Sequence, residues 1–343
     1  MKNRLALFFV FSLSILNYAQ KQANSKDSIK VFYDELFSVL KKAYLHKNAV
    51  DWKLAEAETN QNLTQYGSFK KSLNEIKPLF DKINANHCGI YYQQKRYAGS
   101  GKTIPKEAYT DQLKKKLAAK PAFEARMLND RYAYILMPAM TFMDTSAKNI
   151  SNLAQPMYDQ IASLKTKHHP QGWIVDLRFN TGGNSMPMVL ALYDLLGDNA
   201  FWGKLNLNKK QENLVRLKQG KHLDGSKSPP SIKPSGELIA QAKVAVITGI
   251  FTASSGEVTA LAFKGRPNTK FIGEKSYGAT TTNIQIDLPY GAVMALTTGY
   301  DSDRNGVYYE QIIPDIVVSK QDNFDDLMKD GNVVEAVKFF EGK

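Results

Sequence analysis

After residue 130 the sequence alternates short, continuous apolar runs with segments of helical spacing. These runs and segments follow one another at residues 132–138, 150–164, 172–177, 185–196, 243–250, 256–263 and 269–272. Uninterrupted apolar strands are typical of parallel strands that are buried on both faces and connected by helices. We therefore predict an α/β core over residues 130–343, with a mainly parallel sheet flanked by helices.

The end of this region has a different pattern. Residues 283–288, 293–299 and 316–318 read as hairpin strands, and residues 324–340 read as a closing helix. A few antiparallel strands added to a parallel sheet are common in folds of this class.

The part of the chain that precedes residue 96 is mostly helical in pattern. Apolar side chains recur at helical spacing between residues 27 and 86, and residues 28–85 contain one proline, Pro78. We predict a small helical N-terminal domain over residues 21–95, which ends in a strand at 88–92. Residues 96–129 are polar and rich in lysine, and glycine and proline interrupt them, so we predict a linker or loop there.

Residues 1–20 have the layout of a secretory signal peptide. Lys2 and Arg4 precede an apolar run, Leu5–Leu16, and the small residue Ala19 follows close behind it. The run is short for a permanent membrane helix, although a retained anchor is the alternative interpretation. We predict that the protein is exported, periplasmic or extracellular, and that the mature chain contains no membrane span.

Charge and cysteine content exclude some classes of protein. The formal net charge is +12, but the lysines are spread along the chain and form no basic block interleaved with aromatic residues, so no nucleic-acid partner is expected. Cys88 is the single cysteine, which makes an intrachain disulfide impossible. The apolar core must therefore hold the fold.

Two loops carry candidate chemistry, and each follows an apolar strand. Residues 176–184 contain the pair Gly182–Gly183, whose backbone N–H groups could hold an anion or could simply form a tight turn. Residues 252–257 place Ser254 between a strand and a helix, where a serine can be a nucleophile or an ordinary helix cap. At strand ends of such sheets, reacting groups commonly collect.

Four segments together resemble the tail-specific, or C-terminal processing, peptidases. They are GWIVDLRFNTGGN, ITGIFTASSGEVTALAF, FIGEKSYGATTTNIQIDLPYGA and YYEQIIPDIVV, in the order in which that family has them. The resemblance covers roughly residues 130 to 320. It implies a ClpP/crotonase-like core and a serine endopeptidase that hydrolyses peptide bonds through an acyl-enzyme.

The resemblance also implies roles for individual residues. Ser254 corresponds to the nucleophile and Glu257 to a supporting glutamate, while the N–H of Ser255 with that of Gly182 or Gly183 would form the oxyanion hole. The stretch between residues 87 and 132 is too short for the PDZ domain of many relatives, so no PDZ domain is expected. Neither a metal nor another cofactor is needed for this chemistry.

One departure from the family bears on the general base. The bacterial branch places a lysine where this sequence has Ala279, and Lys275 lies four residues early. The tricorn-like branch instead uses a histidine and a glutamate, and His87 and Glu310 occupy the corresponding positions. In that branch a serine precedes the histidine, and here Asn86 stands in its place. The resemblance thus favours Ser254, His87 and Glu310 over a serine–lysine dyad.

Two alternatives remain open from sequence. Cys88 beside His87 could suggest a thiol nucleophile, but adjacent strand residues face opposite ways, and a small buried residue is the better interpretation. The same core occurs in retinoid-binding proteins, so a lipid- or peptide-binding module without catalysis is the second hypothesis. The joint presence of a serine, a histidine and a glutamate favours catalysis on a polypeptide substrate. An oligomer is possible.

Overall fold

The computed structural model describes residues 26–343, which form two compact units. Unit 1 comprises the chain up to Thr103 together with Thr281–Gly299, and unit 2 comprises Ile104–Thr280 together with Tyr300–Lys343. The predicted signal segment, residues 1–20, lies outside the described residues. Within the described part of the chain, no helix is both long enough and apolar enough to cross a membrane.

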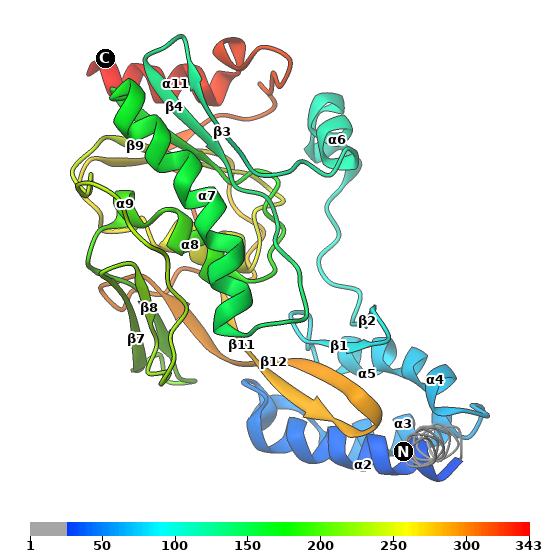
Figure 1. Cartoon of the computed structure of the whole chain (residues 1–343). Helices are drawn as coiled ribbons and strands as arrows, with labels where there is room; N and C mark the ends of the chain where they lie inside the picture. Colours follow the sequence, from blue (N-terminus) through cyan, green and yellow to red (C-terminus); the bar gives the residue numbers. More distant parts are fainter. Residues whose placement is uncertain (1–25) are drawn as a thin grey trace, which may run out of the picture. The chain divides into compact units, whose positions relative to one another are not determined.

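Unit 1 is a helical layer packed on a small antiparallel sheet (Figure 1). Its helices are α2 (Lys26–Ala43), α3 (Trp52–Leu63), α4 (Phe69–Ser72) and α5 (Ile76–Lys82). Its strands are β1 (Gly89–Tyr92), β2 (Lys95–Tyr97), β11 (Thr281–Leu288) and most of β12 (Ala292–Ser302). β1 pairs with β2 and with β12, and β11 also pairs with β12.

The amphipathic pattern of α2 explains this packing. Phe32, Leu36 and Leu40 recur every four residues and are fully buried, and they join Leu288 and Met294 of the returning strands in one core. Unit 1 therefore contains the hairpin 281–299, which the sequence prediction assigned to the core domain.

Unit 2 contains the predicted mainly parallel sheet, and this prediction is confirmed. The strands lie in the order β13 (Ile316–Val317), β10 (Thr269–Gly273), β9 (Val244–Thr248), β5 (Gly172–Asp176), β4 (Tyr132–Leu136) and β3 (Glu124–Leu128). All neighbours are parallel except β3 and β4.

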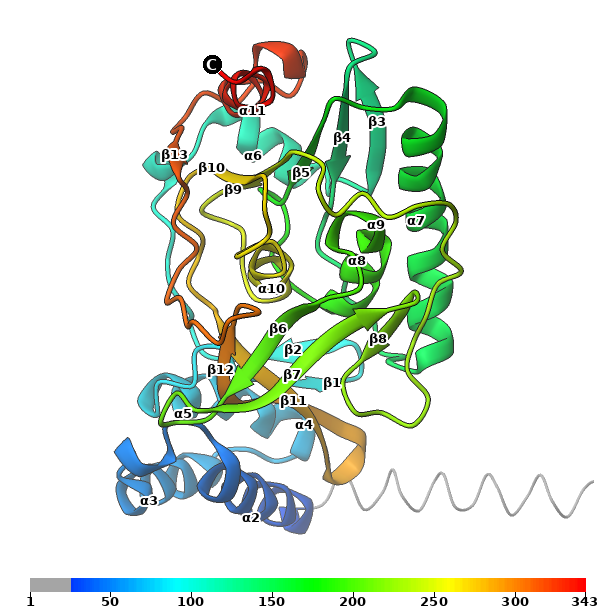
Figure 2. The ribbon, with the colours of Figure 1, turned by 90° about the vertical axis from the view of Figure 1, so that its left-hand side faces the viewer.

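Helices cover both faces of this sheet (Figure 2). One face packs against α7 (Ala147–His168), α8 (Ser185–Ala191), α9 (Tyr193–Leu196) and α10 (Ser255–Leu261). The other face packs against α6 (Asp111–Ala118) and α11 (Gly331–Glu341). Strands buried on both sides explain the uninterrupted apolar runs in the sequence.

Unit 2 also contains antiparallel strands, which continue the sheet of β12 from its end. The end of β12 pairs with β6 (Ala200–Leu205), which pairs with β7 (Gln211–Lys218) and then β8 (Lys221–Leu223). Residues Tyr300–Ser302 form the β12 part of this pairing.

The structure differs from the sequence prediction at three further places. Residues 96–129, expected to be linker, contain α6 and the edge strand β3, because Leu113 and Leu128 are buried in the core of unit 2. Strand β13 pairs in parallel with β10 and is not part of a hairpin. The closing helix begins only at Gly331, because the Asp330 side chain caps it by accepting from the N–H groups of Asn332 and Val333.

Candidate active site

Ser254 occupies the turn between β9 and α10 in a backbone conformation that is rare for a residue with a side chain. Its φ is 53° and its ψ is −117°. A non-glycine residue held there costs about 1–3 kcal/mol and persists only when its surroundings fix it. A strained serine between a strand and a helix is the geometry that exposes a nucleophilic hydroxyl in many hydrolases.

Glu257 is the residue that fixes this turn. Its carboxylate accepts the backbone N–H of Ser254 at 2.9 Å, and the carbonyl of Ser254 accepts from Val258 N at 2.9 Å. Glu257 is completely buried. The serine is therefore a helix cap and a strained turn residue at once, so both interpretations of the motif describe the same position.

The same carboxylate also holds the loop that follows β10. It accepts from Ser276 Oγ at 2.5 Å, from Gly278 N at 2.8 Å and from Ala279 N at 2.7 Å. Burial raises the pKa of Glu257, and these donors offset part of that rise. One buried carboxylate thus links the nucleophile turn to residues 276–279.

The glycine pair lies directly against Ser254. Gly182 and Gly183 have φ values of 117° and 111°, where side chains are strained. A Cβ atom added to Gly182 would lie 3.0 Å from Ser254 Cβ and 3.4 Å from Ser254 Oγ. A Cβ on Gly183 would lie 2.1 Å from the carbonyl oxygen of Met140. Only glycine fits at Gly183, and the pair places backbone groups beside the hydroxyl.

Hydrogen bonds join the two loops because β5 and β9 are parallel neighbours and end at the same sheet edge. Ala253 N donates to Asn180 O at 2.9 Å, and Ser255 Oγ donates to Gly183 O at 2.7 Å. Gly182 N already donates to the side chain of Asn180 at 3.2 Å. Of the two glycine N–H groups, that of Gly183 is therefore the better candidate for an oxyanion hole with Ser255.

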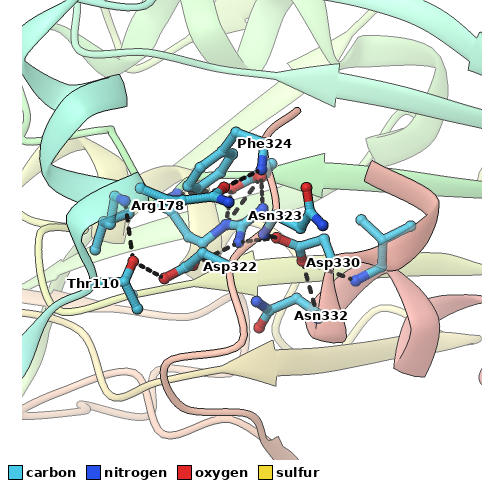
Figure 3. Close-up of polar contacts among 12 residues, drawn as sticks. Thr110, Arg178, Asp322, Asn323, Phe324, Asp330 and Asn332 are labelled. Atoms are coloured by element: carbon cyan, nitrogen blue, oxygen red, sulfur yellow. Dashed lines mark hydrogen bonds and ion pairs between the residues drawn. The ribbon is translucent and has the colours of Figure 1, made fainter. Parts of the chain in front are cut away.

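Arg178 anchors the glycine-pair loop on its other side (Figure 3). The guanidinium is buried and donates to Asp176, to Asp322 at 2.9 Å and to Asp330 at 2.8 Å. Asp322 in turn accepts from Thr110 Oγ1 at 2.8 Å. The loop is thus attached both to the segment before α6 and to the segment before α11.

Glu310 lies beside the loop that Glu257 holds, although its side chain is exposed. Its carbonyl oxygen accepts from Thr280 Oγ1 at 3.2 Å and would lie 3.2 Å from a Cβ atom on Gly278. Two residues later, Ile312 N donates to Ser276 Oγ at 2.8 Å. Residues 310–312 therefore run along the loop 276–280.

His87 belongs to unit 1, where it is half-buried in the turn that precedes β1. Its Nδ1 atom lies 2.6 Å from Thr281 Oγ1, and its carbonyl oxygen accepts from Asn283 Nδ2 at 2.9 Å. Burial, and secondarily the charge of Arg96, lowers the pKa of His87 to about 4. The neutral imidazole, which is the form a general base requires, is favoured.

The remaining sequence candidates fall outside these contacts. Cys88 is fully buried with Sγ 3.5 Å from Thr297 Oγ1, and Asn86 is exposed. Lys275 is exposed, and the position of the family's lysine is taken by the buried Ala279, whose N–H Glu257 holds.

The sequence analysis missed Thr281, Asn283 and Asn180. Thr281 and Asn283 are polar residues at positions i and i+2 of β11, a spacing that places them on one face of the strand. That spacing was a usable signal, but nothing in the sequence indicated which residue would lie opposite.

A parallel α/β core that carries a strained serine after one strand and glycine N–H groups after its neighbour is the arrangement of a serine hydrolase. A model of peptidase family S41 matches residues 131–318, which is more than half of the chain. The chain belongs to this family and is a serine-type peptidase.

Known proteins similar to this chain fit that assignment. A nisin-resistance protein from Lactococcus lactis subsp. lactis is 34% identical over 184 residues, which is 53% of this chain and 55% of the relative. The chain thus matches about half the length of this curated relative. A lipoprotein from Streptococcus agalactiae shares the fold with a TM-score of 0.65 and 23% identity, over 93% of this chain and 96% of that one. Mature CPAF shares it with a TM-score of 0.54 and 9% identity, over 93% and 98%.

Proposed function

We propose that the protein is an exported serine endopeptidase in which Ser254 is the nucleophile, His87 the general base and Glu310 the carboxylate that supports the histidine. The observation that carries the proposal is the strained turn of Ser254, held by Glu257 with Gly182 against the hydroxyl. A fold keeps such strain where the geometry of one side chain matters.

The reaction follows from these roles. Ser254 Oγ attacks the carbonyl carbon of the scissile peptide bond while Nε2 of His87 takes the hydroxyl proton. The N–H groups of Ser255 and Gly183 stabilise the oxyanion. The tetrahedral intermediate collapses to an acyl-enzyme, the amine leaves with the proton from His87, and water hydrolyses the ester by the same steps.

His87 suits the role of base, and the lysine alternative is weak. Burial favours the neutral imidazole. In the proposed triad, the role of the Glu310 carboxylate is to stabilise the imidazolium that forms. Lys275 is exposed and lies four residues before the position of the family's lysine, which Ala279 occupies. Residues 276–279, which Glu257 ties to the nucleophile turn, continue directly into Thr281, the residue in contact with His87.

Export and substrate class rest on the leader-like residues 1–20 and on the relatives. One relative is named a nisin-resistance protein and one structural neighbour is titled a lipoprotein. We propose peptides outside the cytoplasm as substrates, and nisin belongs among the peptides tested. The carrier alternative is not proposed further, because the family assignment favours hydrolysis.

The test is hydrolysis of an unstructured peptide pool that includes nisin by the mature chain, followed by mass spectrometry. Ser254→Ala and His87→Ala should each lower turnover by up to about a million-fold, whereas Lys275→Ala should leave it unchanged. A fluorophosphonate probe should label the wild type and not Ser254→Ala. Activity that survives in His87→Ala but not in Lys275→Ala would replace the histidine with the lysine as base.

A further inference from the structure

We propose that Thr281 is the positioning residue of His87: its hydroxyl accepts the Nδ1–H of the imidazole, so that Nε2 is the unprotonated nitrogen that takes the serine proton. The inference deepens the proposed function and rests on His87 being the general base. It is carried by contacts that lie wholly within unit 1.

The ring contact is short and comes from a stiff residue. Thr281 Oγ1 lies 2.6 Å from His87 Nδ1. Threonine is branched at Cβ, so its χ1 angle is restricted in a strand and the position of its hydroxyl oxygen is defined. The hydroxyl can accept one hydrogen bond while it donates another, which suits a position on Nδ1.

The same strand also holds the main chain of His87. Asn283 Nδ2 donates to the His87 carbonyl at 2.9 Å, and Asn283 Oδ1 accepts from Thr297 Oγ1 at 2.8 Å. Thr281 and Asn283 are two residues apart in β11 and share a face. One strand therefore fixes both the ring and the backbone of the histidine.

The frame behind these contacts is the small antiparallel sheet of unit 1. β11 pairs with β12, and β12 pairs with β1 at Gly89, two residues after His87. His87 lies in the turn that leads into β1, and Thr281 is the first residue of β11, so both residues are adjacent in sequence to strands of the same small sheet.

The chemistry requires one direction for this hydrogen bond. A neutral imidazole carries a single N–H, and the nitrogen that accepts a proton must be the other one. A charged neighbour in unit 1 is the Arg96 guanidinium, whose Nη2 donates to Cys88 O at 3.3 Å and whose charge favours the neutral ring. When Thr281 accepts from Nδ1–H, Nε2 is unprotonated and can act as base. When Thr281 donates to Nδ1, Nε2 carries the proton and cannot act as base.

The test compares Thr281→Val, which keeps the shape without the hydroxyl, with Thr281→Ser, which keeps the hydroxyl. In Thr281→Val, kcat should fall by about tenfold or more with little change in KM, and Thr281→Ser should restore most of the loss. A structural role alone would not separate these two variants. If Thr281→Val unfolds at a lower temperature than the wild type, Thr281→Ala serves as a second variant.

The ¹⁵N shifts of His87 give a readout that does not depend on activity, assigned with His87→Gln in the mature chain. The wild type and Thr281→Ser should show the Nδ1–H tautomer, and Thr281→Val should show a mixture. An Nε2–H tautomer in the wild type, or a Glu310→Gln variant that shifts the tautomer while Thr281→Val does not, would overturn the inference. Full activity in His87→Ala would instead overturn the proposed function, whatever the tautomer.

Discussion

Replacing Glu257 with glutamine tests whether one carboxylate assembles the active site. Its two oxygens each receive two donors: Oε1 accepts from Ser276 and Gly278, and Oε2 from Ser254 and Ala279. An amide can offer its oxygen to one pair only and turns its NH₂ group toward the other pair. Hydrogen bonds to a charged group contribute about 1.5–3 kcal/mol each, so two lost bonds cost about 3–6 kcal/mol.

Part of this loss is offset, because burying a neutral amide costs less free energy than burying a carboxylate. We expect Glu257→Gln to lower the free energy of unfolding by about 2–4 kcal/mol, measured by urea denaturation, with the same m value as the wild type. A relaxed Ser254 turn should also lower kcat by about 100-fold, since small misplacements of a reacting group have effects of that size.

The matched control is Glu107→Gln, which makes the same charge change on an exposed residue of unit 2. It should alter stability by less than about 0.5 kcal/mol and leave kcat unchanged. If Glu257→Gln unfolds at the wild-type urea midpoint and keeps wild-type kcat, the reasoning about the four donors is refuted.

Three further results are expected. Gly183→Ala should be several kcal/mol less stable than Gly225→Ala in thermal or urea unfolding, because both have positive φ but only the Cβ at Gly183 meets backbone, at 2.1 Å; equal stabilities would contradict the clash. The acid limb of kcat/KM should have its midpoint near pH 4, because the folded-state pKa of His87 is lowered to about 4, and it should move upward in Arg96→Gln. Because the pKa of His87 is lower in the folded than in the unfolded protein, His87 contributes to the free energy of unfolding above its unfolded pKa of about 6.5. This contribution is lost as the pH falls toward the folded-state pKa of about 4. Arg178→Lys should destabilise the fold by about 3 kcal/mol in urea, because a lysine cannot reach the three aspartates with a planar fork; an unchanged midpoint would show that the aspartates do not need the guanidinium.

The sequence by itself determined the core and the nucleophile turn. Continuous apolar runs such as 172–177 and 243–250 predicted strands covered on both faces, because burial on both faces leaves no position for a polar side chain. The residues of the two turns could be predicted from the sequence as well. The backbone geometry of the two turns requires glycine at 182 and 183, and serine with a glutamate three residues later. Such local requirements appear in a sequence at a fixed spacing.

Only the tertiary structure decided which residues those elements hold together. No spacing rule relates Glu257 to residues 276–279, Arg178 to Asp322 and Asp330, or His87 to Thr281, since 194 residues separate the last pair. The assignment of 281–299 to the unit that contains His87 was missed for the same reason. Strand pairing between distant segments depends on how much surface both strands bury together in a common core. The sequence of either strand alone does not determine that buried surface.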